Sequence, residues 1–207
     1  MSARLTPTEL ASHVRAGGRV VDVREPPMFA DAHVHGSLNI ALSNRSAPYW
    51  LHVLTRPGEK LAVVTATPHE LALADELIGA AERETIGGLA FDAGAFETAG
   101  LSLATMRTIT PDELADERET IVVDVRERDE WVGGHVPDAI WIPLAELPAR
   151  VDEVPPGRVA LICASGFRSS IAATVLEAAG RDDLANVWGG TTAWMQLGLP
   201  LRQGRER

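Results

Sequence analysis

The feature that most constrains this chain is an internal repeat. The segment VVDVRE at residues 20–25 recurs as VVDVRE at residues 122–127, and a histidine follows each copy at the same interval, at His33 and His135. Further stretches match in the same order: LTPTEL at 5–10 with ITPDEL at 109–114, GSLNI at 36–40 with DAIWI at 138–142, and AFETAGL at 95–101 with AWMQLGL at 193–199. A repeat of about 100 residues predicts two copies of one folding unit. We expect domains of residues 1–104 and 105–207.

Each copy opens with Thr-Pro followed closely by Glu, which is a helix-start signal. Short apolar runs then alternate with helical segments such as residues 71–81 and 171–179. This alternation predicts the α/β class, with a mainly parallel sheet covered by helices on both faces in each domain. The connector at residues 101–108 carries Leu101, Leu103 and Met106, so we expect it to lie against a domain surface and the two halves to dock.

The segment that most clearly indicates a reactive site is residues 159–170, VALICASGFRSS. The apolar run predicts a buried strand that ends at Cys163, and the apolar spacing after Ser169 predicts a helix capped by Gly180. A small-residue loop that leads into a helix amino terminus attracts anions, so a Cys163 thiolate would be stabilised there. A lone cysteine at a strand end is often only a core residue, but Arg168 and the loop favour an anion-binding arrangement.

Composition excludes several classes of function. The formal net charge of −10 argues against nucleic acid or an anionic membrane as partner. Because Cys163 is the only cysteine, an internal disulfide and a thiolate-rich metal site are excluded, and a reducing, cytoplasmic setting is expected. His33 and His35 have no third ligand spaced near them, so neither a metal nor another cofactor is predicted. No apolar run reaches the length of a membrane span.

The repeated VVDVRE, GHVP at residues 134–137, the Cys163 loop and VWGGTTAW at residues 187–194 together resemble the rhodanese family of sulfurtransferases, as a tandem pair. The resemblance implies that Cys163 accepts a sulfane sulfur from a small anionic donor such as thiosulfate. It implies further that Cys163 holds the sulfur as a persulfide and passes it to a thiol, cyanide or protein-thiol acceptor. The substrate-binding loop would comprise Ala164, Ser165, Gly166, Phe167, Arg168 and Ser169, with Arg168 meeting the donor's oxygens.

Other motif residues are assigned to the fold. Asp124 and Arg126 recur in the first copy as Asp22 and Arg24, and His135 recurs as His33. Because the first copy keeps these residues, we interpret Asp124, Arg126 and His135 as a structural motif.

The first copy departs from the pattern where the chemistry lies. Aligning LAVV at residues 61–64 with VALI at residues 159–162 places Thr65 opposite Cys163, Pro68 opposite Gly166 and Glu70 opposite Arg168. The changes remove the nucleophile and an amide donor, and they introduce a negative charge. We therefore expect the N-terminal domain to be catalytically inactive and to shape or cover the other domain's loop.

Two alternatives stay open from the sequence. A cysteine-dependent phosphatase or arsenate reductase would use the same thiolate cradle, although the six-residue loop from Cys163 to Arg168 resembles the sulfurtransferase branch, and an intramolecular-disulfide reductase would need a second cysteine. A non-enzymatic sulfur carrier or interaction module would deliver its persulfide to one protein partner. The physiological donor and acceptor and the oligomeric state are left open.

Overall fold

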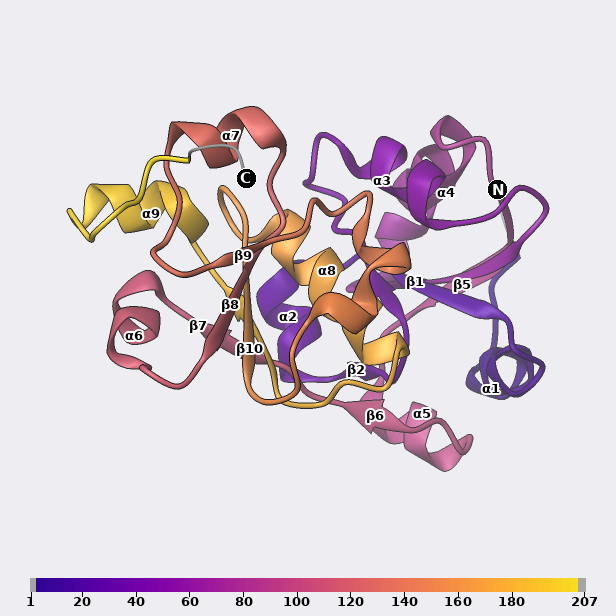
Figure 1. Cartoon of the computed structure of the whole chain (residues 1–207). Coiled ribbons are helices and arrows are strands. Elements are labelled where there is room, and N and C mark those ends of the chain that lie inside the picture. Colours follow the sequence, from indigo (N-terminus) through magenta and orange to yellow (C-terminus); the bar gives the residue numbers. More distant parts are fainter. Residues whose placement is uncertain (1–2, 205–207) are drawn as a thin grey trace. The chain divides into compact units, whose positions relative to one another are not determined.

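The computed structural model of the chain describes residues 3–204. It divides into two compact units, Met1–Thr105 and Met106–Arg207, one residue beyond the division expected from the repeat. Figure 1 labels helices and strands of both units.

The first unit contains a four-stranded parallel sheet in the order β3-β1-β4-β5. A separate antiparallel pair joins β2 to β6. The elements are α1 (Pro7–Arg15), β1 (Arg19–Asp22), α2 (Pro26–Asp31), β2 (His33–Val34), β3 (Leu38–Asn39), α3 (Ala47–Leu54), β4 (Lys60–Thr65), the 3-10 helix η1 (Pro68–Glu70), α4 (Leu71–Ala80), β5 (Glu84–Ala90), α5 (Ala93–Thr98) and β6 (Leu103–Ala104).

The second unit contains a five-stranded parallel sheet in the order β7-β11-β10-β8-β9. The elements are β7 (Arg107–Ile109), α6 (Pro111–Asp116), β8 (Ile121–Asp124), α7 (Arg128–Gly133), β9 (Ile140–Trp141), the 3-10 helices η2 (Leu147–Ala149) and η3 (Val151–Glu153), β10 (Val159–Ile162), α8 (Phe167–Ala178), β11 (Leu184–Val187) and α9 (Gly190–Gln196). The strands β9-β8-β10-β11 have the same order as β3-β1-β4-β5, so the repeat in the sequence is a repeat in topology.

Both faces of the second sheet are covered, as the sequence predicts. Ala160 and Ile162 of β10 pack with Leu114 of α6 and Trp194 of α9 on one face. Alternate residues of a strand point to opposite faces, and helix α8 lies against β10 and β11 on the other face. Every residue of β10 is therefore buried. The α/β class with parallel sheets and flanking helices is confirmed.

The structure differs from the sequence prediction at two boundaries. Helix α8 begins at Phe167, two residues before Ser169, because Gly166 adopts a left-handed conformation (φ 110°) and caps the helix directly after the loop. The connector, for which the sequence analysis predicts no strand, contributes to two short strands, with β6 pairing to β2 and β7 to β11. Leu101 lies in the first unit's core and Leu103 packs against that core.

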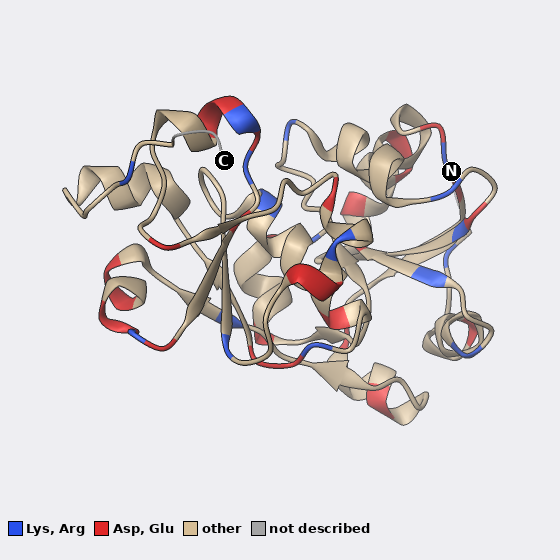
Figure 2. Ribbon diagram, in the orientation of Figure 1, with Lys and Arg blue, Asp and Glu red and all other residues tan. Residues whose placement is uncertain are grey.

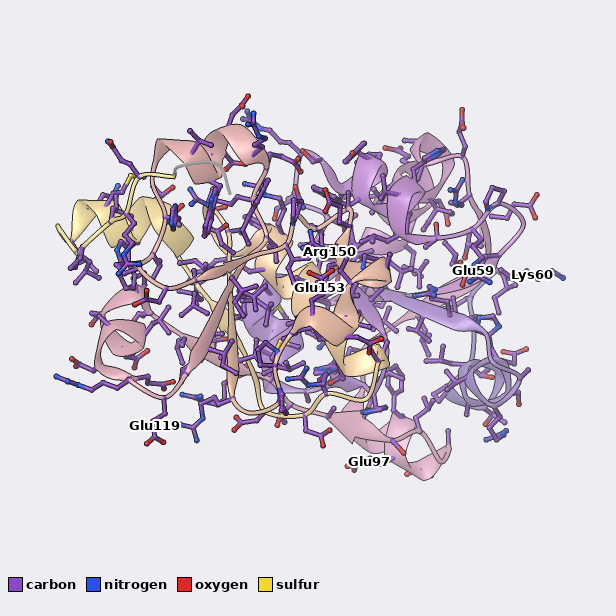
Figure 3. The ribbon with its side chains drawn as sticks, in the orientation of Figure 1. Glu59, Lys60, Glu97, Glu119, Arg150 and Glu153 are labelled. Atoms are coloured by element: carbon purple, nitrogen blue, oxygen red, sulfur yellow. The ribbon has the colours of Figure 1, made fainter. Side chains whose placement is uncertain are left out.

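The segment that precedes β10 is fixed by charge pairs. Arg150 donates hydrogen bonds to Glu146 (2.6 Å) and to Glu153 (2.7 and 2.8 Å), and Figure 3 labels Arg150 and Glu153 on this segment. Leu147, within η2, is fully buried, and η2 lies against α8. These hydrogen bonds lie within residues 146–153, and η2 is the part of that segment that contacts α8. Within residues 3–204, none of the helices is long and apolar enough to cross a membrane.

Candidate active site

Cys163 lies directly after β10, at the carboxyl end of a strand flanked by β8 and β11. Its side chain is 1% exposed. The sulfur accepts a hydrogen bond from the backbone amide of Gly166 (3.1 Å) and lies 3.3 Å from the hydroxyl oxygen of Ser169. Two donors therefore converge on one sulfur at the start of a twelve-residue helix, where the helix dipole also favours negative charge.

Two glycines allow the Cys163 loop to pack closely against the neighbouring segment at residues 188–190. A Cβ at Gly166 would lie 2.6 Å from Cε3 of Trp188, and a Cβ at Gly190 would lie 2.2 Å from the carbonyl oxygen of Cys163. Both glycines also have positive φ angles, +110° and +53°. The backbone of the segment that begins α9 therefore approaches the loop more closely than any side chain permits.

Direct backbone hydrogen bonds hold the loop on that segment. The carbonyls of Cys163, Ala164 and Ser165 accept from the amides of Thr191 (2.8 Å), Thr192 (3.0 Å) and Gly189 (3.2 Å) respectively. The loop carbonyls thus point toward α9. Ala164 and Ser165 serve the loop through their backbone in this arrangement.

Arg168 has a partner that the sequence interpretation did not include. Its two terminal nitrogens donate to the two carboxylate oxygens of Glu130 at 2.6 and 2.7 Å. Burial opposes the charge of Arg168, but the hydrogen bonds to Glu130 and the attraction of Cys163 raise its pKa overall. The hydrogen bonds from Arg168 in turn lower the pKa of Glu130 against the opposing effect of burial. The predicted donor-binding guanidinium is therefore neutralised by a carboxylate in this structure.

Ser169 occupies the first turn of α8 and is fully buried. Besides its contact with Cys163, its hydroxyl lies 2.7 Å from Oδ1 of Asn186 on β11. The remaining loop residue, Phe167, packs edge-on against the ring of Trp188, with centroids 5.6 Å apart. The predicted loop residues are thus brought together with three residues from elsewhere: Glu130, Asn186 and Trp188.

The motif Asp124, Arg126 and His135 ties together the chain that follows β8. Arg126 donates to both oxygens of Asp124 (2.7–3.0 Å) and to the carbonyl of Gly134 (2.8 Å). His135 stacks on Trp131, and its Nδ1 donates to the carbonyl of that residue (3.1 Å). Among the hydrogen bonds described for residues 3–204, none from these three side chains reaches Cys163.

The corresponding loop of the first unit is filled by its own side chain. The carboxylate oxygen Oε2 of Glu70 accepts from the amides of Ala66 (2.8 Å) and Thr67 (3.3 Å). Thr65, at the cysteine position, donates its hydroxyl to the carbonyl of Thr67 (2.8 Å). A carboxylate of the first unit itself therefore accepts from two consecutive amides of this loop, as part of the capping box that begins η1.

Comparison of the two copies could have indicated two residues that the sequence analysis did not include, Glu130 and Asn186. Met28 stands opposite Glu130, at the interval that relates the two VVDVRE segments, and Glu70 stands opposite Arg168. The two members of the ion pair are therefore lost together in the first copy. Asn186 pairs in register with Leu161, whereas Val63, the counterpart of Leu161, pairs with Gly88. Asn186 is thus replaced by glycine in the copy that lacks the cysteine.

Comparison with known proteins identifies the second unit. Residues 110–197 match the model of the rhodanese-like domain. A sulfurtransferase of Allochromatium vinosum is 38% identical over 89 residues, which are 42% of this chain and 83% of that protein. The Bacillus subtilis protein YrkF, whose name describes a candidate sulfur carrier, is 35% identical over 35% of this chain and 40% of its own. A thiosulfate sulfurtransferase structure from Pseudomonas aeruginosa covers 99% of this chain and 44% of its own, at 25% identity and a TM-score of 0.44. On the family model and the relative matched over most of its length, the chain belongs to the rhodanese-like family.

Proposed function

We propose that this protein is a sulfurtransferase in which Cys163 carries the sulfur as a persulfide. The observation that carries the proposal is the convergence of the Gly166 amide and the Ser169 hydroxyl on the Cys163 sulfur. Both groups favour a thiolate over a thiol, and a thiolate is the form that attacks sulfur. The family match and a relative named as a sulfurtransferase support the same reaction class.

The proposed cycle begins with a donor such as thiosulfate. The Cys163 thiolate attacks the outer sulfur, the S–S bond of thiosulfate breaks, and sulfite leaves with the electron pair. The persulfide anion that results is stabilised by the same donors, and the amides of Ala164 and Ser165 are available to it. Those two amides correspond to the pair that holds the Glu70 carboxylate in the first unit. Attack by cyanide or a thiolate on the outer sulfur then returns the Cys163 thiolate.

In this proposal the first unit does not transfer sulfur. Thr65 cannot form a thiolate, Pro68 has no amide to donate, and Glu70 occupies the loop's anion-binding amides. The site residues of the protein would therefore all lie in residues 105–207.

The proposal is tested by intact mass after incubation with thiosulfate. Because the chain has one cysteine, we expect a gain of one sulfur atom that cyanide removes, and no gain in Cys163→Ser. Equal masses for the two proteins after treatment would refute the proposal. Hydrolysis of an aryl phosphate that depends on Cys163 would replace it with the phosphatase alternative.

A sulfur carrier is the second candidate, favoured by the match to a protein with that description. A carrier would load fully with sulfur but turn over small acceptors slowly. Comparing the loaded fraction with the steady-state rate of thiocyanate formation, across thiosulfate, 3-mercaptopyruvate and glutathione persulfide as donors, separates the two candidates.

A further inference from the structure

The hydroxyl group of Ser169 faces two acceptors with one proton. Its oxygen lies 3.3 Å from the sulfur of Cys163 and 2.7 Å from Oδ1 of Asn186. A serine hydroxyl can donate only one hydrogen bond at a time. The proton therefore points either to the sulfur or to the amide oxygen, and Asn186 takes part in that choice.

Asn186 is an unusual residue for its position. It lies within β11, where all four residues are buried, and it is itself 1% exposed. Its neighbours Ala185 and Val187 point into the apolar core on one face, so Asn186 points to the face covered by α8. Its Nδ2 is one of the buried side-chain atoms within residues 3–204 that have no hydrogen-bond partner. A buried N–H without a partner is costly and rare in proteins.

The unpaired Nδ2 is explained if the amide has two orientations. While Cys163 is a thiol, its S–H can donate to Ser169, whose hydroxyl donates to Oδ1 of Asn186. Once the sulfur is anionic, the Ser169 hydroxyl donates its proton to the sulfur instead. Oδ1 of Asn186 then faces a lone pair of the Ser169 oxygen, so that two acceptors lie opposite each other. A half-turn of the amide brings Nδ2 to Ser169 as a donor. The unpaired atom becomes a carbonyl oxygen, which proteins leave unpaired more often than an N–H.

The internal repeat offers an independent observation. The counterparts of Cys163, Ser169 and Asn186 in the first unit are Thr65, Leu71 and Gly88, by the alignment of β10 with β4 and the matching strand registers. The first unit therefore lacks the sulfur, the serine hydroxyl and the amide together, and the Thr65 hydroxyl donates instead to the carbonyl of Thr67 (2.8 Å). The Leu71 side chain occupies the space instead, since its Cδ2 would lie 2.8 Å from a Cβ at Gly88.

We propose that Asn186 is a positioning residue for sulfur transfer, which turns its amide to hold the Ser169 hydroxyl on the sulfur whenever Cys163 is a thiolate or a persulfide anion. The role in sulfur transfer rests on the proposed function. The hydrogen-bond chain itself, in which Nδ2 donates to the Ser169 hydroxyl and the hydroxyl donates to the sulfur, requires only that Cys163 is a thiolate. Linked donors of this kind strengthen one another.

The test is the pH dependence of alkylation of Cys163 by iodoacetamide, followed by intact mass. The single cysteine makes each adduct a report on this sulfur. The midpoint of the profile reports thiolate stability, whereas the plateau rate at high pH reports access. We expect Asn186→Leu and Ser169→Ala each to move the midpoint upward by about 0.5 to 1 pH unit, so that three- to tenfold less thiolate is present at a given pH.

The double variant and a matched control complete the experiment. Asn186→Leu combined with Ser169→Ala should shift the midpoint no further than Ser169→Ala alone, because the amide acts through the hydroxyl. Asn39, a buried asparagine on β3 that donates to the carbonyls of Asp22 (3.1 Å) and Arg24 (2.9 Å), supplies the control. Asn39→Leu should reduce stability and leave the midpoint in place. The charged groups Arg168 and Glu130 are unchanged in all of these variants.

An unmoved midpoint in folded Asn186→Leu, or additive shifts in the double variant, would overturn the proposal. Asn186→Val and Asn186→Thr serve if the leucine variant does not fold. Misfolding of all three would assign the amide to the fold and would also overturn it. No sulfur donor is used, so this outcome is independent of the thiosulfate mass test of the proposed function.

Discussion

At the scale of single residues, Arg168 carries its own counter-ion. The bidentate pair with Glu130 is partly buried, with exposed fractions of 17% for the Arg168 side chain and 34% for that of Glu130. Because the pKa of Glu130 is lowered, the pair is present at neutral pH, and its contribution to stability is lost as the pH falls through that lowered pKa. The guanidinium that the loop presents is therefore neutralised by this carboxylate.

Glu130→Gln is expected to strengthen the binding of an anionic donor. The glutamine keeps the shape of the side chain but leaves the charge of Arg168 uncompensated. A pair of this exposure is worth up to about 1 kcal/mol, so the KM for thiosulfate should fall by up to about fivefold and become more sensitive to salt.

Glu119→Gln is the matched control for that experiment, because it makes the same change in net charge. Glu119, labelled in Figure 3, lies just before β8, whereas Cys163 follows the parallel strand β10, so the two residues lie at opposite ends of the strands. The Glu119 variant should leave KM unchanged. A rise of KM in Glu130→Gln would show instead that Glu130 holds Arg168 in its productive place.

A second prediction concerns Gly166. Gly166→Ala should destabilise the protein by about 2–4 kcal/mol, because the new Cβ meets a positive φ and the ring of Trp188 together. It should also draw the Gly166 amide away from the sulfur and slow sulfur loading at least about tenfold. Urea unfolding and the time course of the mass gain measure the two effects.

Gly180→Ala isolates the backbone part of that cost. Gly180 has a φ of +84°, but no atom lies within 4 Å of the place that a Cβ would take there, so this variant should lose only about 1 kcal/mol and load sulfur normally. Equal effects of the two substitutions would contradict the role given to the contact with Trp188.

At the scale of elements, the strand, loop and helix around Cys163 were predictable because each leaves a local signal. The apolar run predicts β10, and the small residues predict the loop. The apolar periodicity places the start of α8 two residues too late, because Phe167 and Arg168 do not contribute to that pattern. The left-handed conformation of Gly166 sets the true start of the helix. The strands β6 and β7 have two and three residues, too few for a pattern.

The partners of the loop could not be predicted from local patterns. Glu130 and Arg168 are separated by 38 positions in the sequence, and Ser169 and Asn186 by 17. Their contacts depend on where α7 and β11 lie against the loop, which no local periodicity specifies. Only the comparison of the two copies indicates which residues contact the loop, because both members of an interacting pair are absent from the first copy.

The loop of the first unit yields a prediction of its own. In a Cys163→Ser background, Thr65→Cys should gain no sulfur from thiosulfate, because Glu70 already fills the amides of Ala66 and Thr67 and Pro68 offers none. The measurement is again intact mass. A gain of one sulfur would show that the first unit needs only a nucleophile, and it would contradict the role given to Glu70.

At the scale of the whole molecule, each unit has a sheet and an apolar core of its own. Charges of both signs are distributed along the chain (Figure 2), and the acidic excess gives a net charge of −10. The complete sheet of the second unit includes β7, which pairs with β11. The folding and the chemistry of that unit are therefore expected to be self-sufficient.

We expect a fragment of residues 106–207 to fold cooperatively and to load sulfur at a rate within about threefold of the full chain, as its core is complete. Circular dichroism with urea unfolding, and intact mass after thiosulfate, are the measurements. A folded fragment that fails to load would instead assign the first unit a part in shaping the active loop, and adding residues 1–105 separately should then restore loading.

The carboxylate of Glu70 also bears on how the two copies diverged. A duplicated enzyme whose second nucleophile is lost can regain it by one mutation as long as the rest of the site stays intact. In the proposed function the loop of the first unit is already occupied by Glu70, so a cysteine in place of Thr65 alone would bring no sulfur transfer until Pro68 and Glu70 had also changed. Several substitutions would have to come together before the first copy could transfer sulfur, and each of them alone would bring no gain.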